Sequence, residues 1–98
     1  MATERQKLNS LSEDHPVMIC RHIFDKTRDV LALAIDEDRR ATLDCGDEEH
    51  GEKDWHLTHL RPLVTADATL ANAPAIAPHE YCERSFRGGP WWISAFGD

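Results

Sequence analysis

The sequence predicts a small α+β domain in which a mainly antiparallel sheet packs against one or two short helices. Three observations predict this class. Short apolar stretches with polar turns between them fill residues 16–45, helical spacing follows in residues 54–72, and a strand-like segment with an aromatic end covers residues 79–96. With 98 residues, the chain is long enough for one hydrophobic core.

The first part of the sheet is expected to be a three-strand meander. The three apolar stretches cover residues 16–24, 29–35 and 40–45. Asp25–Arg28 and Asp36–Arg39 lie between them and have the length and composition of hairpin turns. Since short turns join neighbouring antiparallel strands, each stretch is expected to pair with the next one along the chain.

The region of residues 54–72 is predicted to hold the helices. Apolar residues recur there at helical spacing: Leu57, Leu60 and Val64. Pro62 removes a backbone donor and clashes with the preceding turn, so a break is expected near Arg61. Asp67 is a suitable cap for a short helical turn over residues 68–72.

The two ends of the chain differ in character. Residues 1–14 are polar, which predicts a flexible tail or a frayed first helix, so the domain is expected to cover residues 15–98. Residues 79–86 are expected to form a last strand, and the aromatic segment 91–96 either pairs with the sheet or packs on the core. Adjacent strand residues face opposite ways, so one ring of the Trp91–Trp92 doublet is expected to point outward.

Targeting signals and cysteine usage indicate a reducing compartment. No apolar run approaches the roughly 18 residues of a membrane span, and the N-terminus lacks the apolar core of a secretory signal. The three cysteines are odd in number and widely spaced, which argues against a disulfide framework. The sequence therefore predicts a cytoplasmic protein, of bacterial type, with reduced thiols.

Negative charge is concentrated in one part of the chain. The net charge is −7, and nine acidic but only three basic residues lie between Asp36 and Asp54. This balance repels phosphate backbones, which argues against nucleic-acid binding, and favours a basic protein partner or a cation. The residues expected to bind a partner are six acids and one aromatic anchor: Asp36, Glu37, Asp38, Asp47, Glu48, Glu49 and Trp92.

The second candidate is a zinc site made of cysteine and histidine. Six residues have ligand chemistry in this part of the chain: Cys20, His22, Cys45, His50, His56 and His59. On a helix, His56 and His59 would share a face. The alternative interpretation is that Cys20 and Cys45 are buried strand residues that behave as small hydrophobes.

No pattern in the sequence predicts an enzyme. There is no phosphate-binding glycine loop, dinucleotide motif or nucleophile elbow. A catalytic role for Cys45 is disfavoured because Asp44 and Asp47 would raise the pKa of its thiol.

With these residues identified, the chain resembles a group of small bacterial proteins without an established activity. The matching motifs are Cys20-Arg21-His22, Asp44-Cys45-Gly46, Trp55-His56 with His59-Leu60, Asp67-Ala68-Thr69-Leu70, and Trp91. The chain is also loosely similar to immunity-type proteins of toxin systems. This resemblance implies a non-catalytic, cytoplasmic interaction module of the immunity or inhibitor kind, and the alternative is a small zinc-binding protein.

Overall fold

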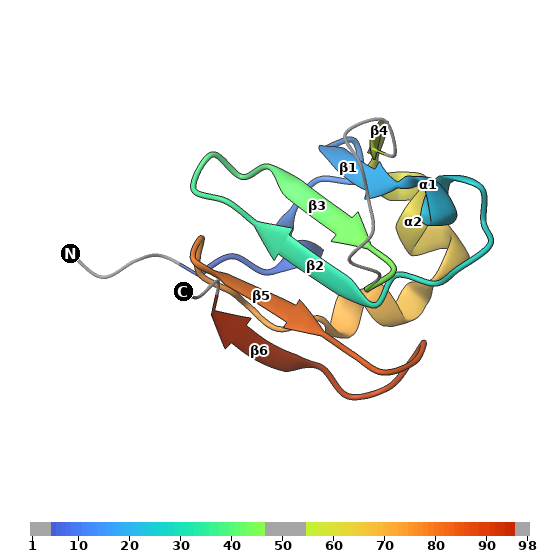
Figure 1. The fold of residues 1–98 in the computed structure, drawn as a ribbon. Helices are drawn as coiled ribbons and strands as arrows, with labels where there is room; N and C mark the ends of the chain where they lie inside the picture. The colour runs from blue at the N-terminus through green and yellow to red at the C-terminus, as the bar shows by residue number, and fades with distance from the viewer. Residues whose placement is uncertain (1–4, 47–54, 96–98) are drawn as a thin grey trace.

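A computed structural model describes residues 5–46 and 55–95. In this part of the chain six strands form one sheet in the order β4-β1-β3-β2-β5-β6 (Figure 1). The strands are β1 (Pro16–Cys20), β2 (Ala32–Ile35), β3 (Ala41–Asp44), β4 (Trp55–His59), β5 (Glu80–Glu83) and β6 (Trp92–Ala95). The helices are η1 (Leu8–Ser10), α1 (Arg21–Phe24), α2 (Leu60–Ala66) and η3 (Ala68–Asn72). The predicted α+β class is confirmed.

The strand order differs from the predicted meander. The hairpin of β2 and β3 forms as expected, and Asp36 Oδ1 accepts the backbone N–H groups of Asp38 and Arg40 in its turn. However, β1 does not pair with β2. It lies parallel to β3, with Ile19 opposite Leu43, and this is the one parallel pair in the described sheet.

The physical reason is the short helix α1, which begins directly after β1. Arg21–Phe24 is helical, and Asp25 N–H donates to the carbonyl of Arg21 at 2.8 Å. The chain therefore leaves the sheet after Cys20 and returns at Ala32, and the position between β1 and β2 is taken by β3. A crossover of this kind joins strands that are not neighbours, whereas a meander needs a tight turn.

The segment Trp55–His59 is a strand, and the prediction of a helix there was wrong. All five of its residues pair with β1, from Cys20 opposite Trp55 to Pro16 opposite His59. The open edge of β1 thus outweighed the helical spacing of the apolar residues. Helix α2 starts only at Leu60, which places Pro62 in its first turn, where the N–H that proline lacks would have no intrahelical partner.

Other local predictions in the second half are confirmed. Asp67 caps η3, and its Oδ1 accepts the N–H of Thr69 at 3.0 Å. β5 and β6 pair antiparallel, with Glu83 opposite Trp92. Gly88, at φ 81°, takes a left-handed conformation in the turn between them. No helix in residues 5–46 and 55–95 is long and apolar enough to cross a membrane.

The core lies between the sheet and the helical segments. Inward-facing strand residues such as Val17, Leu33 and Leu43 pack with Leu60 from α2 and Leu70 from η3. Burial alternates along β1, where Val17 and Ile19 are buried while Pro16 and Met18 are exposed. This alternation is typical of a sheet that is covered on one face.

The described part of the first 14 residues packs on this core. Leu8 is fully buried and Leu11 nearly so. Gln6 and Ile76 exchange two backbone hydrogen bonds of 2.9 Å. From Arg5 onward, the segment expected to be a tail therefore lies against the domain.

Candidate metal centre

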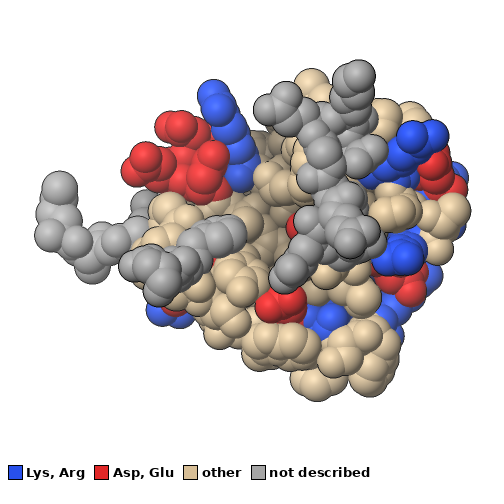
Figure 2. Space-filling model, in the orientation of Figure 1, with Lys and Arg blue, Asp and Glu red and all other residues tan. Residues whose placement is uncertain are grey.

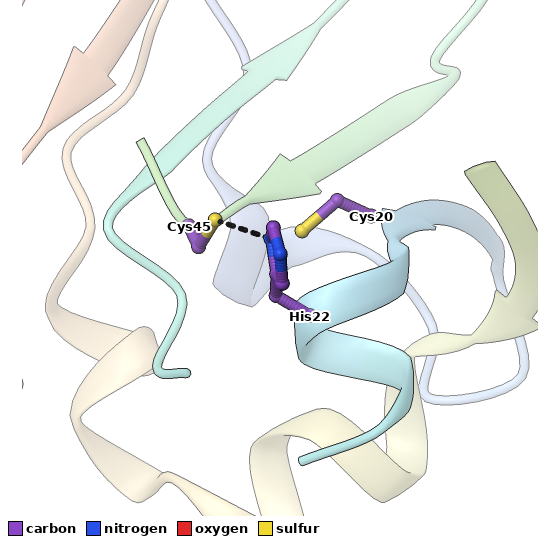
Figure 3. Close-up of side chains that lie close together, drawn as sticks. All are labelled: Cys20, His22 and Cys45. Atoms are coloured by element: carbon purple, nitrogen blue, oxygen red, sulfur yellow. Dashed lines mark hydrogen bonds between the residues drawn. The ribbon is translucent and has the colours of Figure 1, made fainter. Parts of the chain in front are cut away.

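Three of the predicted ligands meet at one edge of the sheet. Cys20 ends β1, and Cys45 directly follows β3. Because β1 and β3 are parallel neighbours, their carboxyl ends lie at the same edge, and this brings the two cysteines together. His22, in α1, completes the group, and one ligand atom of each residue lies within 4.8 Å of the other two (Figure 3).

The turn of the chain after β1 positions the histidine. Cys20 has extended backbone angles and is the N-cap of α1, so the chain changes direction at this residue. In Figure 3 the imidazole of His22 stands between the two sulfur atoms. On the other side, Gly46 at φ 82° turns the chain directly after Cys45, and Asp44 Oδ1 accepts the N–H of this glycine at 2.7 Å.

The two thiols are buried and the imidazole is half-buried. Cys20 is 0% and Cys45 4% exposed. Cys45 Sγ lies 3.3 Å from His22 Nδ1, within hydrogen-bonding distance for sulfur. Burial raises the pKa of Cys20 above its ordinary value of 9.0, and this effect outweighs the backbone hydrogen bonds from Ile23 and Cys45 that lower it. Cys20 is therefore a protonated thiol at neutral pH, which is unsuited to act as a nucleophile.

Two sulfur donors and one imidazole nitrogen are the ligand set of a thiophilic metal ion such as zinc. In a tetrahedral zinc site with Zn–S bonds of ~2.3 Å, neighbouring sulfur ligands are about 3.8 Å apart. The ligand atoms of Cys20, His22 and Cys45 are at most 4.8 Å from one another, which exceeds that spacing by no more than about 1 Å. Small side-chain rotations would therefore be sufficient to close the group around an ion.

The remaining histidines lie elsewhere or outside the described residues. His56, on β4, stacks its ring on Phe24 with centroids 4.2 Å apart. His59 is exposed and pairs with Pro16, the first residue of β1, whereas Cys20 is the last residue of that strand. Because both are in a strand, the helical face expected to bring them together does not form. His50 lies outside the described residues.

The third cysteine, Cys82, belongs to a different environment. It is fully buried on β5 and pairs with Leu33. Burial raises the pKa of its thiol to about 12. It is not part of the group formed by Cys20, His22 and Cys45.

The predicted partner-binding residues are spread over the sheet. Asp36, Glu37 and Asp38 form the turn between β2 and β3, and Figure 2 shows acidic side chains gathered over this turn. Trp92 is 46% exposed on β6. Trp92 pairs with Glu83 of β5, and Glu83 in turn pairs with Ala32 of β2. Ala32 is the first residue of β2, at the end of the strand that is far from the acidic turn. The other predicted acids, Asp47, Glu48 and Glu49, lie outside the described residues.

One buried polar group had no signal in the sequence. The Arg84 guanidinium donates to Asp67 Oδ2 at 2.6 Å, to Thr69 Oγ1 and to the carbonyl of Val30. It also lies 4.6 Å from the ring centroid of Trp91. Trp91 thus packs inward while Trp92 is exposed, as expected for adjacent residues that face opposite ways.

Comparison with known proteins gives no match to a family model, to a curated protein or to a solved structure. The resemblance drawn from the sequence motifs therefore stays a prediction.

Proposed function

We propose that this protein binds a thiophilic divalent metal ion, zinc, through Cys20, His22 and Cys45. The observation that carries the proposal is the convergence of two thiols and one imidazole, from the end of β1, from α1 and from the residue after β3, to within 4.8 Å of one another. Of the six candidate ligands, these three are the ones that the described part of the fold brings together.

Charge balance supports a divalent ion at this position. A buried thiolate without a counter-charge is unfavourable, which is consistent with the raised pKa of Cys20. Two thiolates and a neutral imidazole carry a charge of −2, and a divalent cation brings the buried group to neutrality. Thiols that coordinate zinc are deprotonated by the ion itself. Three protein ligands would leave a fourth position for water or another ligand.

The test is metal content and affinity in matched cysteine variants. Purified protein is incubated with zinc, dialysed and assayed by elemental analysis, and the affinity is measured by competition with a chromophoric chelator. We expect one zinc per chain and a higher melting temperature with zinc than without it, since a ligand that binds only the folded state stabilises it. Cys20→Ser and Cys45→Ser are each expected to weaken binding at least tenfold.

Cys82→Ala is the matched control, because Cys82 is also a buried cysteine but lies outside the group. It is expected to lower stability without changing the affinity for zinc. Equal zinc affinity in Cys20→Ser, Cys45→Ser and the wild type would refute the proposal, as would a metal content near zero in folded wild-type protein.

The exposed acidic turn favours a second proposal, that the protein is a non-catalytic interaction module of the immunity or inhibitor kind. Asp36, Glu37 and Asp38 offer a negative surface to a basic protein partner. Capture of such a partner from a lysate should weaken with rising salt and with the double variant Glu37→Lys, Asp38→Lys. Capture that is unchanged by both would contradict this role. Trp92, which is 46% exposed on β6, stays the predicted aromatic anchor of this contact.

A further inference from the structure

A cavity of about 360 Å³ lies between α1 with its following loop and α2. Its apolar wall includes Ile19, Ile23, Val30 and Leu63. The volume is in the range of small-molecule sites, which are usually apolar with a few placed polar groups. Cys20, His22 and Cys45 do not line this cavity, so it is separate from the proposed zinc site.

The rim of the cavity is basic, although the protein as a whole is acidic. Lys26, Arg28 and Arg87 line it together with two acids, in a chain with a net charge of −7. Both acids face arginines. Asp67 is paired with Arg84 at 2.6 Å and with Arg87 at 3.4 Å, and Asp29 lies 4.0 Å from Arg87. The residues that line the cavity therefore carry a net charge of +1, from three bases and two acids, in a chain whose net charge is negative.

The basic side chains at the rim differ in what they already bind. The guanidinium of Arg87 is held by the Ala66 carbonyl at 2.6 Å and by its two carboxylate neighbours. Lys26 is exposed and forms no ion pair with a described residue. Its backbone is left-handed, at φ 61°, and its N–H donates to the Ile23 carbonyl at 3.0 Å. This turn carries Lys26 from α1 to the rim of the cavity.

We propose that this cavity binds a small amphipathic anion, an alkyl monocarboxylate of medium chain length. The alkyl chain would lie against Ile19, Ile23 and Leu63, and the carboxylate would pair with the ammonium of Lys26 at the rim. Apolar burial supplies binding free energy in proportion to the area removed from water. The positive rim selects a negative head group over a neutral or positive one.

A series of four ligands separates the contribution of the alkyl chain from that of the charged head group. Octanoate, octanol and octylammonium have the same chain but different head groups, and acetate has the charge without the chain. Isothermal titration calorimetry at low salt should show octanoate binding about five- to tenfold more tightly than octanol. Octylammonium should bind more weakly than octanol, and acetate should not bind measurably. Methyl resonances of Ile23, Val30 and Leu63 should shift with octanoate.

Variants at the rim test the role of the charge. Lys26→Asn removes the ammonium and keeps a residue that tolerates left-handed backbone, so the fold should be retained while octanoate affinity falls about five- to tenfold. Lys26→Arg should restore most of the affinity. Lys7→Asn, at an exposed lysine that does not line the cavity, is the matched control and should change nothing.

Three results would each overturn the proposal. The first is equal affinity for octanoate and octanol, and the second is an affinity for octanoate that is the same in Lys26→Asn and the wild type. The third is octanoate binding that leaves the methyl groups of Ile23, Val30 and Leu63 unshifted. The titrations use metal-free and zinc-loaded protein, and the same result is expected for each, so the outcome does not depend on the zinc proposal.

Discussion

At the scale of single residues, the buried pair of Arg84 and Asp67 has the clearest energetic role. The Arg84 side chain has no exposed surface and that of Asp67 is 9% exposed. Burial alone would raise the pKa of Asp67, but the hydrogen bonds from Thr69 and Arg84 outweigh it and hold this pKa below the ordinary 3.8. Ionised Asp67 therefore stabilises the fold above about pH 3.8, and this contribution disappears as the pH falls through the lower folded-state pKa.

Asp67→Asn is expected to lower the free energy of unfolding by about 3 kcal/mol at pH 7, because it leaves the buried Arg84 without its counter-charge. The loss should shrink toward pH 2, where the wild-type carboxyl is protonated as well. Urea unfolding at both pH values measures the difference. Asp29→Asn, at an exposed carboxylate 4.0 Å from Arg87, is the control and should cost less than about 1 kcal/mol. A loss from Asp67→Asn that is independent of pH would contradict this account.

At the scale of elements, the junctions after β1 and β3 create the Cys20–His22–Cys45 group. α1 begins at once after Cys20, and the left-handed Gly46 turns the chain after Cys45. Neither strand needs a special sequence for this. The ligands meet because β1 and β3 run parallel, so that both junctions lie at one edge of the sheet.

Gly46→Ala is expected to destabilise the protein by about 1 kcal/mol, since a side chain is unfavourable at φ 82°. A Cβ there would be 3.7 Å from Leu31 Cβ, so the cost arises from the backbone and not from a clash. We also expect weaker zinc binding, because Cys45 precedes this turn. Gly88→Ala, at φ 81° in the turn before β6, is the matched control.

Thermal unfolding and chelator competition compare the two glycine variants. The control should lose a similar stability and keep the zinc affinity of the wild type. Identical zinc affinities in Gly46→Ala and Gly88→Ala would show that this turn does not position Cys45.

At the scale of the whole molecule, the N-terminal segment is part of the core. Leu8 is fully buried with Leu70 and Ile76, which belong to the second half of the chain. The bridge between Gln6 and Ile76 adds two backbone hydrogen bonds to this contact. The segment thereby contributes buried side chains to the core of the domain.

Leu8→Ala is expected to lower the free energy of unfolding by about 2–4 kcal/mol, since it removes a fully buried side chain and leaves a cavity. Ser10→Ala, in the same 3₁₀ turn but exposed, should change it by less than about 1 kcal/mol. Chemical denaturation of both variants measures the two free energies of unfolding. Similar stability in the two would mean that the segment does not contribute to the core.

Local patterns in the sequence were sufficient for the fold class, the β2–β3 hairpin and the Asp67 cap, whereas for segment 91–96 they left open whether it pairs with the sheet or packs on the core. These features depend on hydrogen bonds and side-chain alternation between residues that are close in the chain. The sequence also identified Cys20, His22 and Cys45 as possible ligands, but did not separate them from His56 and His59.

Only the tertiary structure decided which ligands meet and which segments pair. Trp55–His59 has helical apolar spacing but forms a strand, because β1 offers it an open edge. Leu8 carries too weak a pattern to indicate that it is buried under residues some 60 positions away. The cysteines converge because β1 skips its neighbour in sequence and lies beside β3. Strand order depends on contacts between distant residues, and the periodicity of a single segment contains no information about them.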